Sequence, residues 1–262
     1  MSAEQSDILL SIEPPLAWIV VNRPAARNAL TRAVWRGIAA RVDSLSSNAE
    51  VRVVILRGAG EEAFMAGADI TEFPAIRADA RATLEYDRDT MRALHAIENL
   101  AQPTIAMING ACFGGGCSVA LACDLRIAAD HATLAIPAAR LGLAYPFVDN
   151  LVHTVGKGNA ADILLSARAL RADEALRIGL VNRVVPAAEL DSVVRRYALQ
   201  IAEGAPLTLA AHKAAIQEAT RREAERNPSR LRTLVARCFD SDDYREGVAA
   251  FIEKRKPKFF GR

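Results

Sequence analysis

The sequence predicts an α/β fold in which a core of strands and helices precedes a helical C-terminal region. Short runs of β-branched residues end at proline or glycine, as buried strands do, and segments with apolar residues at helical spacing separate them. No strand pattern follows residue 186. Because a chain of 262 residues can bury one large core, we expect a core over residues 1–200 and a helical region over residues 201–262.

The first predicted unit is a strand, a helix and a second strand. The strands are expected over residues 16–24 and 51–60. Thr31 suits the N-cap of the intervening helix, because its hydroxyl can accept a hydrogen bond from a free backbone N–H. The apolar residues near helical spacing are Val34, Ile38, Val42 and Leu45.

The later elements follow the same signals. Helices are predicted over 78–100, 115–121, 160–170, 171–179 and 188–203, and strands over 103–110, 124–130, 132–137 and 180–186. Beyond residue 208 the chain is predicted to be helical almost to its end, with a break at Asn227 and Pro228. No repeat of fixed period is visible in the sequence.

The charge balance excludes a general attraction to polyanions. The chain has 33 basic and 31 acidic residues, a formal charge of +2, so neither a nucleic acid nor an anionic membrane is an expected partner. The N-terminal segment MSAEQSD lacks the pattern of a secretory signal. The apolar stretch 104–123 is interrupted by Asn109 and glycines, so a buried strand, turn and helix is expected rather than a membrane span. We therefore expect a soluble, cytoplasmic protein.

The four cysteines, Cys112, Cys117, Cys123 and Cys238, lack paired C-x-x-C spacing. Three of them lie in one apolar segment, which is typical of buried thiols in a reducing compartment. The sequence therefore predicts neither a disulfide nor a metal site.

A run of three glycines, Gly114 to Gly116, opens a predicted helix. The first N–H groups of a helix have no partner within it and lie at the positive end of its dipole, so they can hold an anion or an oxyanion. Ser118, three residues into the helix, shares a face with Gly115. The alternative is a glycine turn that only lets the helix pack closely on a sheet.

A second turn of small residues follows the predicted strand 51–60, within EEAFMAGADITEF, residues 61–73. Two such turns could present two N–H donors to one carbonyl oxygen. That arrangement is an oxyanion hole.

A series of motifs follows in order along nearly the whole chain: VNRPAARNAL, FMAGADITE, PTIAMINGACFGGGC, ACDLRIAAD, VGKGNAADILLSAR, ADEALRIGLVNRVVP and DDYREGVAAFIEKRKPKF. Together they resemble the crotonase family, the enoyl-CoA hydratase/isomerase superfamily. The resemblance implies a spiral of ββα units with a C-terminal helical region that serves oligomerisation and covers the coenzyme A site. It also implies homotrimers or dimers of trimers. The implied ligand is an acyl-CoA, with coenzyme A as part of the substrate and no separate cofactor or metal.

The resemblance also assigns roles to single residues. The backbone N–H groups of Ala68 and Gly115 would form the oxyanion hole. The positions that match the coenzyme A channel are Ala26, Ala29, Ala66, Asp69 and Ile70. Phe251 and Lys254 match positions that help to cover the coenzyme A end. Thr71 stands where some members carry a lysine near the phosphates.

The sequence departs from the family pattern where the hydratases carry two glutamates. Ser118 and Ala138 occupy those positions, and YPFVDNL, residues 145–151, replaces a glycine-rich segment. A positioned acid or base contributes roughly 10²- to 10⁴-fold to a rate, so water addition by the two-glutamate route is expected to be impaired. The oxyanion hole consists of backbone groups, and these substitutions leave it in place.

Three other groups are candidates for acid or base. Asp149 lies in the divergent segment, predicted to be a loop, and is alternatively a surface aspartate. Tyr145 could donate a proton, or it could merely fill the space beside Ala138. His153 lies four residues after Asp149 and could pair with it on one helix face, with a solvent-exposed pair as the alternative.

The expected activity is that of an acyl-CoA lyase or isomerase using groups other than the two glutamates. The alternatives are a relative that decarboxylates or cleaves C–C bonds through an enolate, and a non-catalytic acyl-CoA binder. A serine hydrolase built on Ser118 is a distant alternative. Ser118 lies a helical turn beyond the glycines rather than in the turn, and His153 is too close to Asp149 for that fold.

Overall fold

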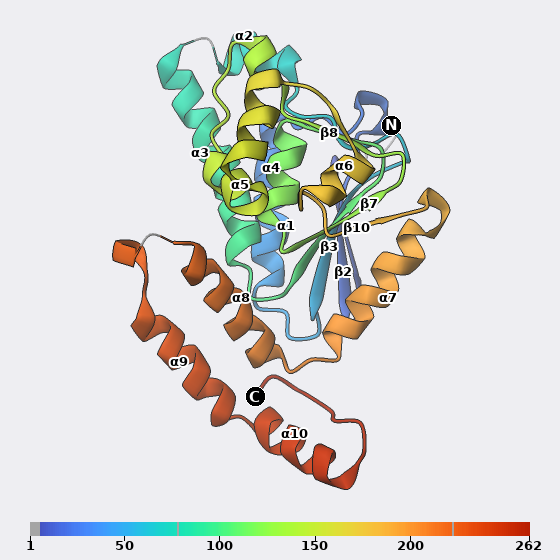
Figure 1. The fold of residues 1–262 in the computed structure, drawn as a ribbon, viewed down its shortest axis with the longest axis vertical. Helices are drawn as coiled ribbons and strands as arrows, with labels where there is room; N and C mark the ends of the chain where they lie inside the picture. Colours follow the sequence, from blue (N-terminus) through green and yellow to red (C-terminus); the bar gives the residue numbers. More distant parts are fainter. Residues whose placement is uncertain (1–5, 78, 222) are drawn as a thin grey trace.

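The computed structural model describes residues 6–77, 79–221 and 223–262. Its larger sheet has six strands in the order β1-β2-β3-β5-β7-β10, and its smaller sheet has four in the order β4-β6-β8-β9 (Figure 1). The large-sheet strands are β1 (Ile8–Glu13), β2 (Leu16–Val21), β3 (Val53–Gly58), β5 (Thr104–Ile108), β7 (Leu125–Ala129) and β10 (Arg183–Val185). The small-sheet strands are β4 (Ala63–Met65), β6 (Ala111–Phe113), β8 (Thr133–Ala135) and β9 (Leu170–Arg171).

Successive strands of the core alternate between the two sheets. The chain passes from β3 to β4, from β5 to β6 and from β7 to β8, so each pair places one strand in each sheet before a helix follows. Within the large sheet β2, β3, β5, β7 and β10 run parallel, whereas β1 pairs antiparallel with β2. This arrangement confirms the predicted α/β spiral of ββα units.

Helices lie on both faces of the large sheet. The helices of the described chain are α1 (Arg32–Leu45), α2 (Phe73–Ile76), α3 (Ala80–Asn99), α4 (Gly115–Ala122), α5 (Val148–Ser166), α6 (Ala172–Arg177), α7 (Leu190–Ala202), α8 (Pro206–Thr220), α9 (Pro228–Phe239) and α10 (Asp242–Glu253). In β3, Val54 and Leu56 join the core beneath α1 and α3, whereas Val53 and Ile55 pack with α7. This alternation follows from the two-residue period of a strand, and it explains why the central strands are apolar throughout.

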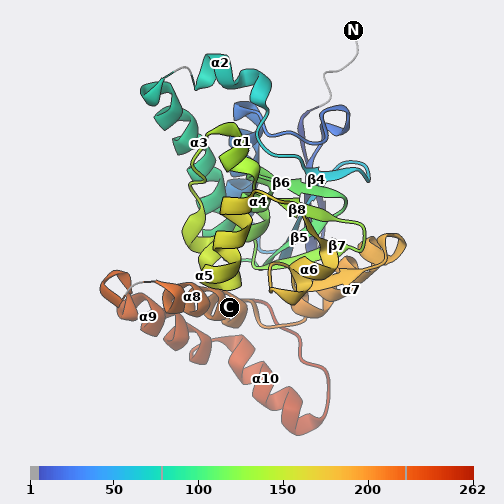
Figure 2. The same cartoon turned by 45° about the horizontal axis from the view of Figure 1, so that its top comes forward.

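Helices α8, α9 and α10 form the C-terminal region, which lies at one end of the core (Figure 2). Lys213 of α8 is buried and reaches the core, where its ammonium donates a hydrogen bond to the Asp124 carboxylate at 2.8 Å. It also approaches the carbonyl oxygens of Ile97 and Gln102 at 3.4 and 3.3 Å. Helix α8 is thereby tied to the core, and α9 and α10 extend away from it.

The structure confirms several sequence-based predictions. Thr31 caps α1 by accepting a hydrogen bond from the Val34 N–H, and Cys112, Cys117 and Cys123 are buried free thiols. The predicted break at Asn227 is the N-cap of α9. The start of the predicted helix 78–100 falls partly outside the described residues, and α3 occupies the rest.

Two predictions of local structure were wrong. The segment 145–151 is not a loop throughout, because α5 begins at Val148 and Asp149 lies in its first turn. That helix extends to Ser166, so residues 160–170 form only its final part and the start of β9. The strands β1, β4, β6 and β9 were not predicted from the sequence.

In the described ranges, none of the helices is both long and apolar enough to cross a lipid bilayer.

Candidate active site

Two glycine turns meet where the two sheets converge on α4. Gly67 follows β4 with φ of 103°, and Gly114 precedes α4 with φ of 49°. A Cβ atom on Gly67 would lie 3.2 Å from the Phe113 carbonyl oxygen and 3.9 Å from the Gly115 nitrogen. The two turns therefore approach backbone to backbone, which requires glycine for both its positive φ and its lack of a side chain.

Each turn carries one N–H without an acceptor. The Leu30 N–H donates to Gly67 O at 2.8 Å and the Asp69 N–H donates to Leu30 O at 3.0 Å. Leu30 and Ala68 are thus paired as in a parallel β-bridge, and the Ala68 N–H points away from Leu30. Gly115 is the first residue of α4, where no intrahelical acceptor exists. Neither N–H donates a hydrogen bond within the described ranges. Two adjacent free donors at a helix start are suited to one developing oxyanion.

Large apolar side chains lie directly beneath these donors. A Cβ atom on Gly115 would lie 3.0 Å from Trp35 Cζ2 and 3.1 Å from Leu30 Cδ1. The Trp35 indole N–H donates to the Tyr86 hydroxyl at 2.9 Å, and burial raises the pKa of Tyr86. This rigid floor excludes water from the underside of the site, which strengthens any hydrogen bond made there.

The loop between β2 and α1 is held by one buried amide. The Asn28 amide donates to Ala59 O at 2.9 Å and to Ala63 O at 2.8 Å, and its oxygen accepts the Arg23 N–H at 3.0 Å. Asn28 also has a φ of 57°, a left-handed conformation that asparagine tolerates better than most residues. This amide fixes the segment that carries Ala26 and Ala29.

The five predicted channel residues lie on neighbouring segments. Ala26 is exposed in the β2–α1 loop, and Ala29 and Ala66 are partly exposed. Asp69 and Ile70 begin the 3₁₀ turn that directly follows Ala68.

Asp69 is the charged member of this set. Its carboxylate accepts the Thr71 hydroxyl at 2.6 Å and pairs with the Arg23 guanidinium at 3.0 Å. These contacts, the Thr71 hydrogen bond foremost, lower the pKa of Asp69, so the carboxylate remains ionised and is held by these two partners.

A pair of hydroxyls lies one helical turn beyond Gly115. Ser118 is buried in α4, and its hydroxyl donates to the Tyr145 oxygen at 3.0 Å. Burial raises the pKa of Tyr145 well above its usual range, so this hydroxyl stays protonated. Ala138, also matched to a catalytic glutamate, is partly buried against the same core. Ser118 and Tyr145 were both predicted site residues, but only the tertiary structure shows that their hydroxyls are in contact.

Asp149 and His153 are both exposed in the first half of α5. Within the described residues no hydrogen bond or ion pair joins them. Their roles as acid or base remain predictions.

Two thiols support the glycine turn from behind. The Cys117 thiol donates to Cys112 O at 3.0 Å, and the two sulfur atoms lie 3.8 Å apart. Burial raises the pKa of Cys112 well above its usual range, so it is neutral and unreactive. No cluster of metal-ligating side chains occurs in the ranges that the structure describes.

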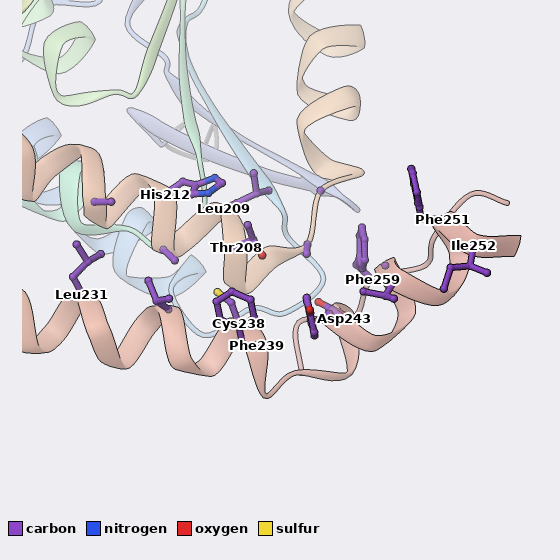
Figure 3. A pocket seen from close by; sticks show the side chains of 18 residues that line it. Thr208, Leu209, His212, Leu231, Cys238, Phe239, Asp243, Phe251, Ile252 and Phe259 are labelled. Atoms are coloured by element: carbon purple, nitrogen blue, oxygen red, sulfur yellow. The ribbon is translucent and has the colours of Figure 1, made fainter. Parts of the chain in front are cut away.

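Phe251 and Lys254 lie at the end of α10, far from the glycine turns of the same chain (Figures 1 and 2). The Phe251 side chain is 85% exposed. It borders an apolar cavity of about 880 Å³ between α8, α9 and α10 (Figure 3), lined by aromatic and aliphatic residues that include Leu231, Phe239, Ile252 and Phe259. This cavity is separate from the oxyanion turns.

Comparison with known proteins decides the family. A sequence profile of the enoyl-CoA hydratase/isomerase family matches residues 12–262. The chain belongs to this family. It is 34% identical to a short-chain-enoyl-CoA hydratase of Clostridium acetobutylicum over 98% of both chains, and 36% identical to a crotonyl-CoA hydratase of Syntrophomonas wolfei, again over 98% of both.

Solved structures of the enoyl-CoA hydratase/isomerase family superpose closely on this chain. An enoyl-CoA hydratase/carnithine racemase from Magnetospirillum magneticum has a TM-score of 0.92 at 39% identity, covering 99% of this chain and 97% of its own. An enoyl-CoA hydratase/isomerase family protein from Hyphomonas neptunium has a TM-score of 0.93 at 37% identity, covering 98% of both. The protein is therefore an enoyl-CoA hydratase-like member of a family that processes acyl-CoA.

Sequence reasoning missed two residues that shape the site. Asn28 holds the β2–α1 loop in place through the two hydrogen bonds that its amide donates. The sequence showed only that a polar residue precedes the helix capped by Thr31. Trp35 forms the floor under Gly115, although the helical pattern alone assigns it to the core.

Proposed function

We propose that this protein binds an acyl-CoA thioester and stabilises its enolate. The thioester oxygen would accept hydrogen bonds from the N–H groups of Ala68 and Gly115. The observation that supports this role is that neither N–H donates a hydrogen bond within the described ranges and that the two turns approach backbone to backbone. Each donor of an oxyanion hole contributes roughly 10²- to 10³-fold to a rate. Coenzyme A would lie along Ala26, Ala29, Ala66, Asp69 and Ile70, as the family resemblance implies.

The enzyme class is a lyase or isomerase in which the usual carboxylate pair is missing. Ser118 and Ala138 stand at the positions of the two glutamates, and the Ser118 hydroxyl is hydrogen-bonded to that of Tyr145. We expect hydration of crotonyl-CoA to be slower than in a two-glutamate hydratase by roughly 10²- to 10⁴-fold, the value of one positioned acid or base.

We also propose a homotrimer or a dimer of trimers. Within one chain Phe251 and Lys254 lie far from the acyl-CoA site, so their predicted role in covering coenzyme A needs a neighbouring subunit. The exposed apolar side chains around the α8–α10 cavity support such an association.

The test removes one donor N–H by replacing Gly115 with proline. Gly115 is the first residue of α4, a position where proline is well tolerated, and proline has no N–H. Gly115→Ala is the matched control, because it adds the same Cβ against Trp35 and keeps the N–H. Acetoacetyl-CoA is the probe, since its bound enolate has its own absorbance band. Titration calorimetry measures affinity.

We expect the wild-type protein and Gly115→Ala to bind acetoacetyl-CoA and raise the enolate band. Gly115→Pro should lose both effects by roughly 10²-fold or more. Equal enolate formation in the proline and alanine variants would contradict the role of this donor. Failure of the wild-type protein to bind any acyl-CoA would overturn the proposed function.

A further inference from the structure

Arg126 places a buried positive charge at the far end of the helix that begins with Gly115. The residue lies on β7, and its side chain turns into the interior. Its Nη1 group donates hydrogen bonds to Ala120 O at 3.3 Å and to Cys123 O at 2.8 Å. These carbonyls belong to the last turn of α4 and to its C-cap. The guanidinium therefore lies at the negative end of the α4 dipole, where a cation is favoured.

Within the described ranges, no carboxylate is hydrogen-bonded to this guanidinium. Its Nε group donates to Leu180 O at 2.9 Å, so the acceptors that it contacts there are backbone carbonyls. Asp124 is the carboxylate that acts on Arg126 from a greater distance, and it is bound by the Lys213 ammonium at 2.8 Å. Since an arginine keeps its proton in proteins, two positive charges stand against one negative charge in this cluster.

The thiols beside Arg126 do not supply the missing negative charge. Burial raises the pKa of Cys123 to about 12 and the pKa of Cys112 well above its usual range, so both thiols stay neutral. Burial also lowers the pKa of Arg126, as expected for a cation that is poorly compensated by its surroundings. The interior at this end of α4 therefore keeps a net positive charge.

The body of α4 separates this charge from the proposed oxyanion hole. The helix has eight residues, so about 12 Å lies between its ends. All residues from Gly116 to Ala122 are buried, so the intervening medium is protein and dissolved salt screens the charge little. At this separation two unit charges change an equilibrium by roughly 3- to 10-fold if the effective dielectric constant is about 20 to 40.

We propose that Arg126 is a positioning residue whose charge, acting through α4, stabilises the enolate held by the Gly115 N–H. This assignment rests on the acyl-CoA site proposed above. The enolate would supply the negative charge that the cluster lacks, and it would lie at the positive end of the same helix dipole.

The backbone of Arg126 is held as firmly as its side chain. Its N–H donates to the Asn182 side-chain oxygen at 2.8 Å, and its carbonyl oxygen accepts the Asn182 N–H at 2.8 Å. The cation is therefore fixed before the ligand arrives. A fixed charge stabilises an enolate without any rearrangement at the moment when the enolate forms.

The experiment measures the enolate band of bound acetoacetyl-CoA as a function of pH. The probe loses an α-proton to the buffer as its enolate forms, so the band gives the pH at which half of the bound probe is enolised. Arg126→Gln removes the charge, whereas Arg126→Lys keeps it. We expect Arg126→Gln to weaken enolisation at fixed pH by roughly 3- to 10-fold, and Arg126→Lys to restore most of the wild-type value.

Two controls separate the charge from damage to the fold. Arg183→Gln removes an exposed guanidinium that lies 4.2 Å from the centre of the Tyr197 ring, and it should leave the enolate band unchanged. Butyryl-CoA forms no stable enolate, so it measures binding alone. Its affinity for Arg126→Gln should match that for the wild type.

A second pair of variants tests the same charge without altering Arg126. Lys213→Met removes the other cation of the cluster and leaves Asp124 to oppose Arg126. Lys213→Arg keeps the charge. We expect Lys213→Met to weaken enolisation of the bound probe and Lys213→Arg to preserve it. This pair decides the question if Arg126→Gln does not fold.

The outcomes separate this inference from the proposed function. Equal enolisation in Arg126→Gln and wild type, or an equal loss in Arg126→Gln and Arg126→Lys, would overturn the role of the charge. A parallel loss of butyryl-CoA affinity in Arg126→Gln would show that the residue only maintains the fold. Binding of acetoacetyl-CoA by the wild type without an enolate band would instead overturn the enolate stabilisation proposed above, and absence of all acyl-CoA binding would remove the proposed function itself.

Discussion

At the scale of single residues, the site depends on glycines that let backbones touch. Gly116 is the sharpest case, because a Cβ atom there would lie 2.3 Å from the Met65 carbonyl oxygen. That carbonyl belongs to β4 and cannot move like a flexible side chain. A substitution must therefore push the start of α4 away from β4 and disturb the N–H groups of Ala68 and Gly115, the donors of the proposed oxyanion hole.

We predict that Gly116→Ala lowers the free energy of unfolding by about 1–3 kcal/mol, the usual cost of overpacking. The control is Gly158→Ala in α5, where no atom lies within 4 Å of the added Cβ. Alanine should be neutral there or stabilise by up to about 1 kcal/mol. Urea denaturation of both variants checks the prediction, and similar losses in the two would contradict it.

Asn28 gives a second residue-scale prediction. Asn28→Ala leaves the carbonyls of Ala59 and Ala63 without their donor and places alanine at a φ of 57°. We expect a loss of about 1–3 kcal/mol in the free energy of unfolding, the cost of unsatisfied buried groups. Asn159→Ala on the exposed surface of α5 should change it by less than about 0.5 kcal/mol. Weaker acyl-CoA binding should accompany the Asn28 change alone.

At the scale of elements, α8 is joined to the core by an ion pair between buried Lys213 and partly exposed Asp124. Lys213→Met would leave Asp124 without its cation, and because solvent reaches the carboxylate we expect a loss of about 1–3 kcal/mol, below the cost of breaking a fully buried pair. Proteolysis in the connection before α8 should become faster. The exposed pair of Arg92 and Asp43 supplies the control, since Arg92→Met should cost less than about 1 kcal/mol. Unchanged proteolysis of Lys213→Met would show that other contacts hold α8.

The contact between α3 and α5 predicts a pH dependence. Burial raises the pKa of Glu98, although a hydrogen bond from the Asn150 amide opposes the shift. The folded chain then keeps this proton to higher pH than the unfolded chain does. The contribution of Glu98 to stability therefore falls as pH rises from the ordinary carboxyl pKa through the raised one.

The measurement is the free energy of unfolding of wild type minus that of Glu98→Gln, taken as a function of pH. We expect this difference to decrease as pH rises through the window. Exposed Glu61→Gln controls for the loss of a negative charge. A difference that increases with pH would mean that the hydrogen bond outweighs burial.

At the scale of the whole molecule, the C-terminal helices present apolar surface that one chain does not cover. Phe251 and Ile252 are 85% and 73% exposed beside the α8–α10 cavity. We predict that light scattering finds an oligomer for the wild type and a smaller species for the Phe251→Ser/Ile252→Ser double variant. Leu165→Ser, an exposed apolar position on α5, is the control. A monomeric wild type at micromolar concentration would contradict the proposed association.

The sequence by itself determined the strand runs, the Thr31 cap and the two glycine turns, because each of these is encoded within a few residues. It determined the family and the spiral fold through the resemblance of its motifs. Only the tertiary structure decided that Ser118 meets Tyr145 and that Trp35 lies under Gly115. These contacts join segments 27 and 80 residues apart in the chain, and no local pattern specifies which distant side chains pack together. For the same reason the sequence could not show that Asp149 lies in the first turn of α5 with its side chain exposed.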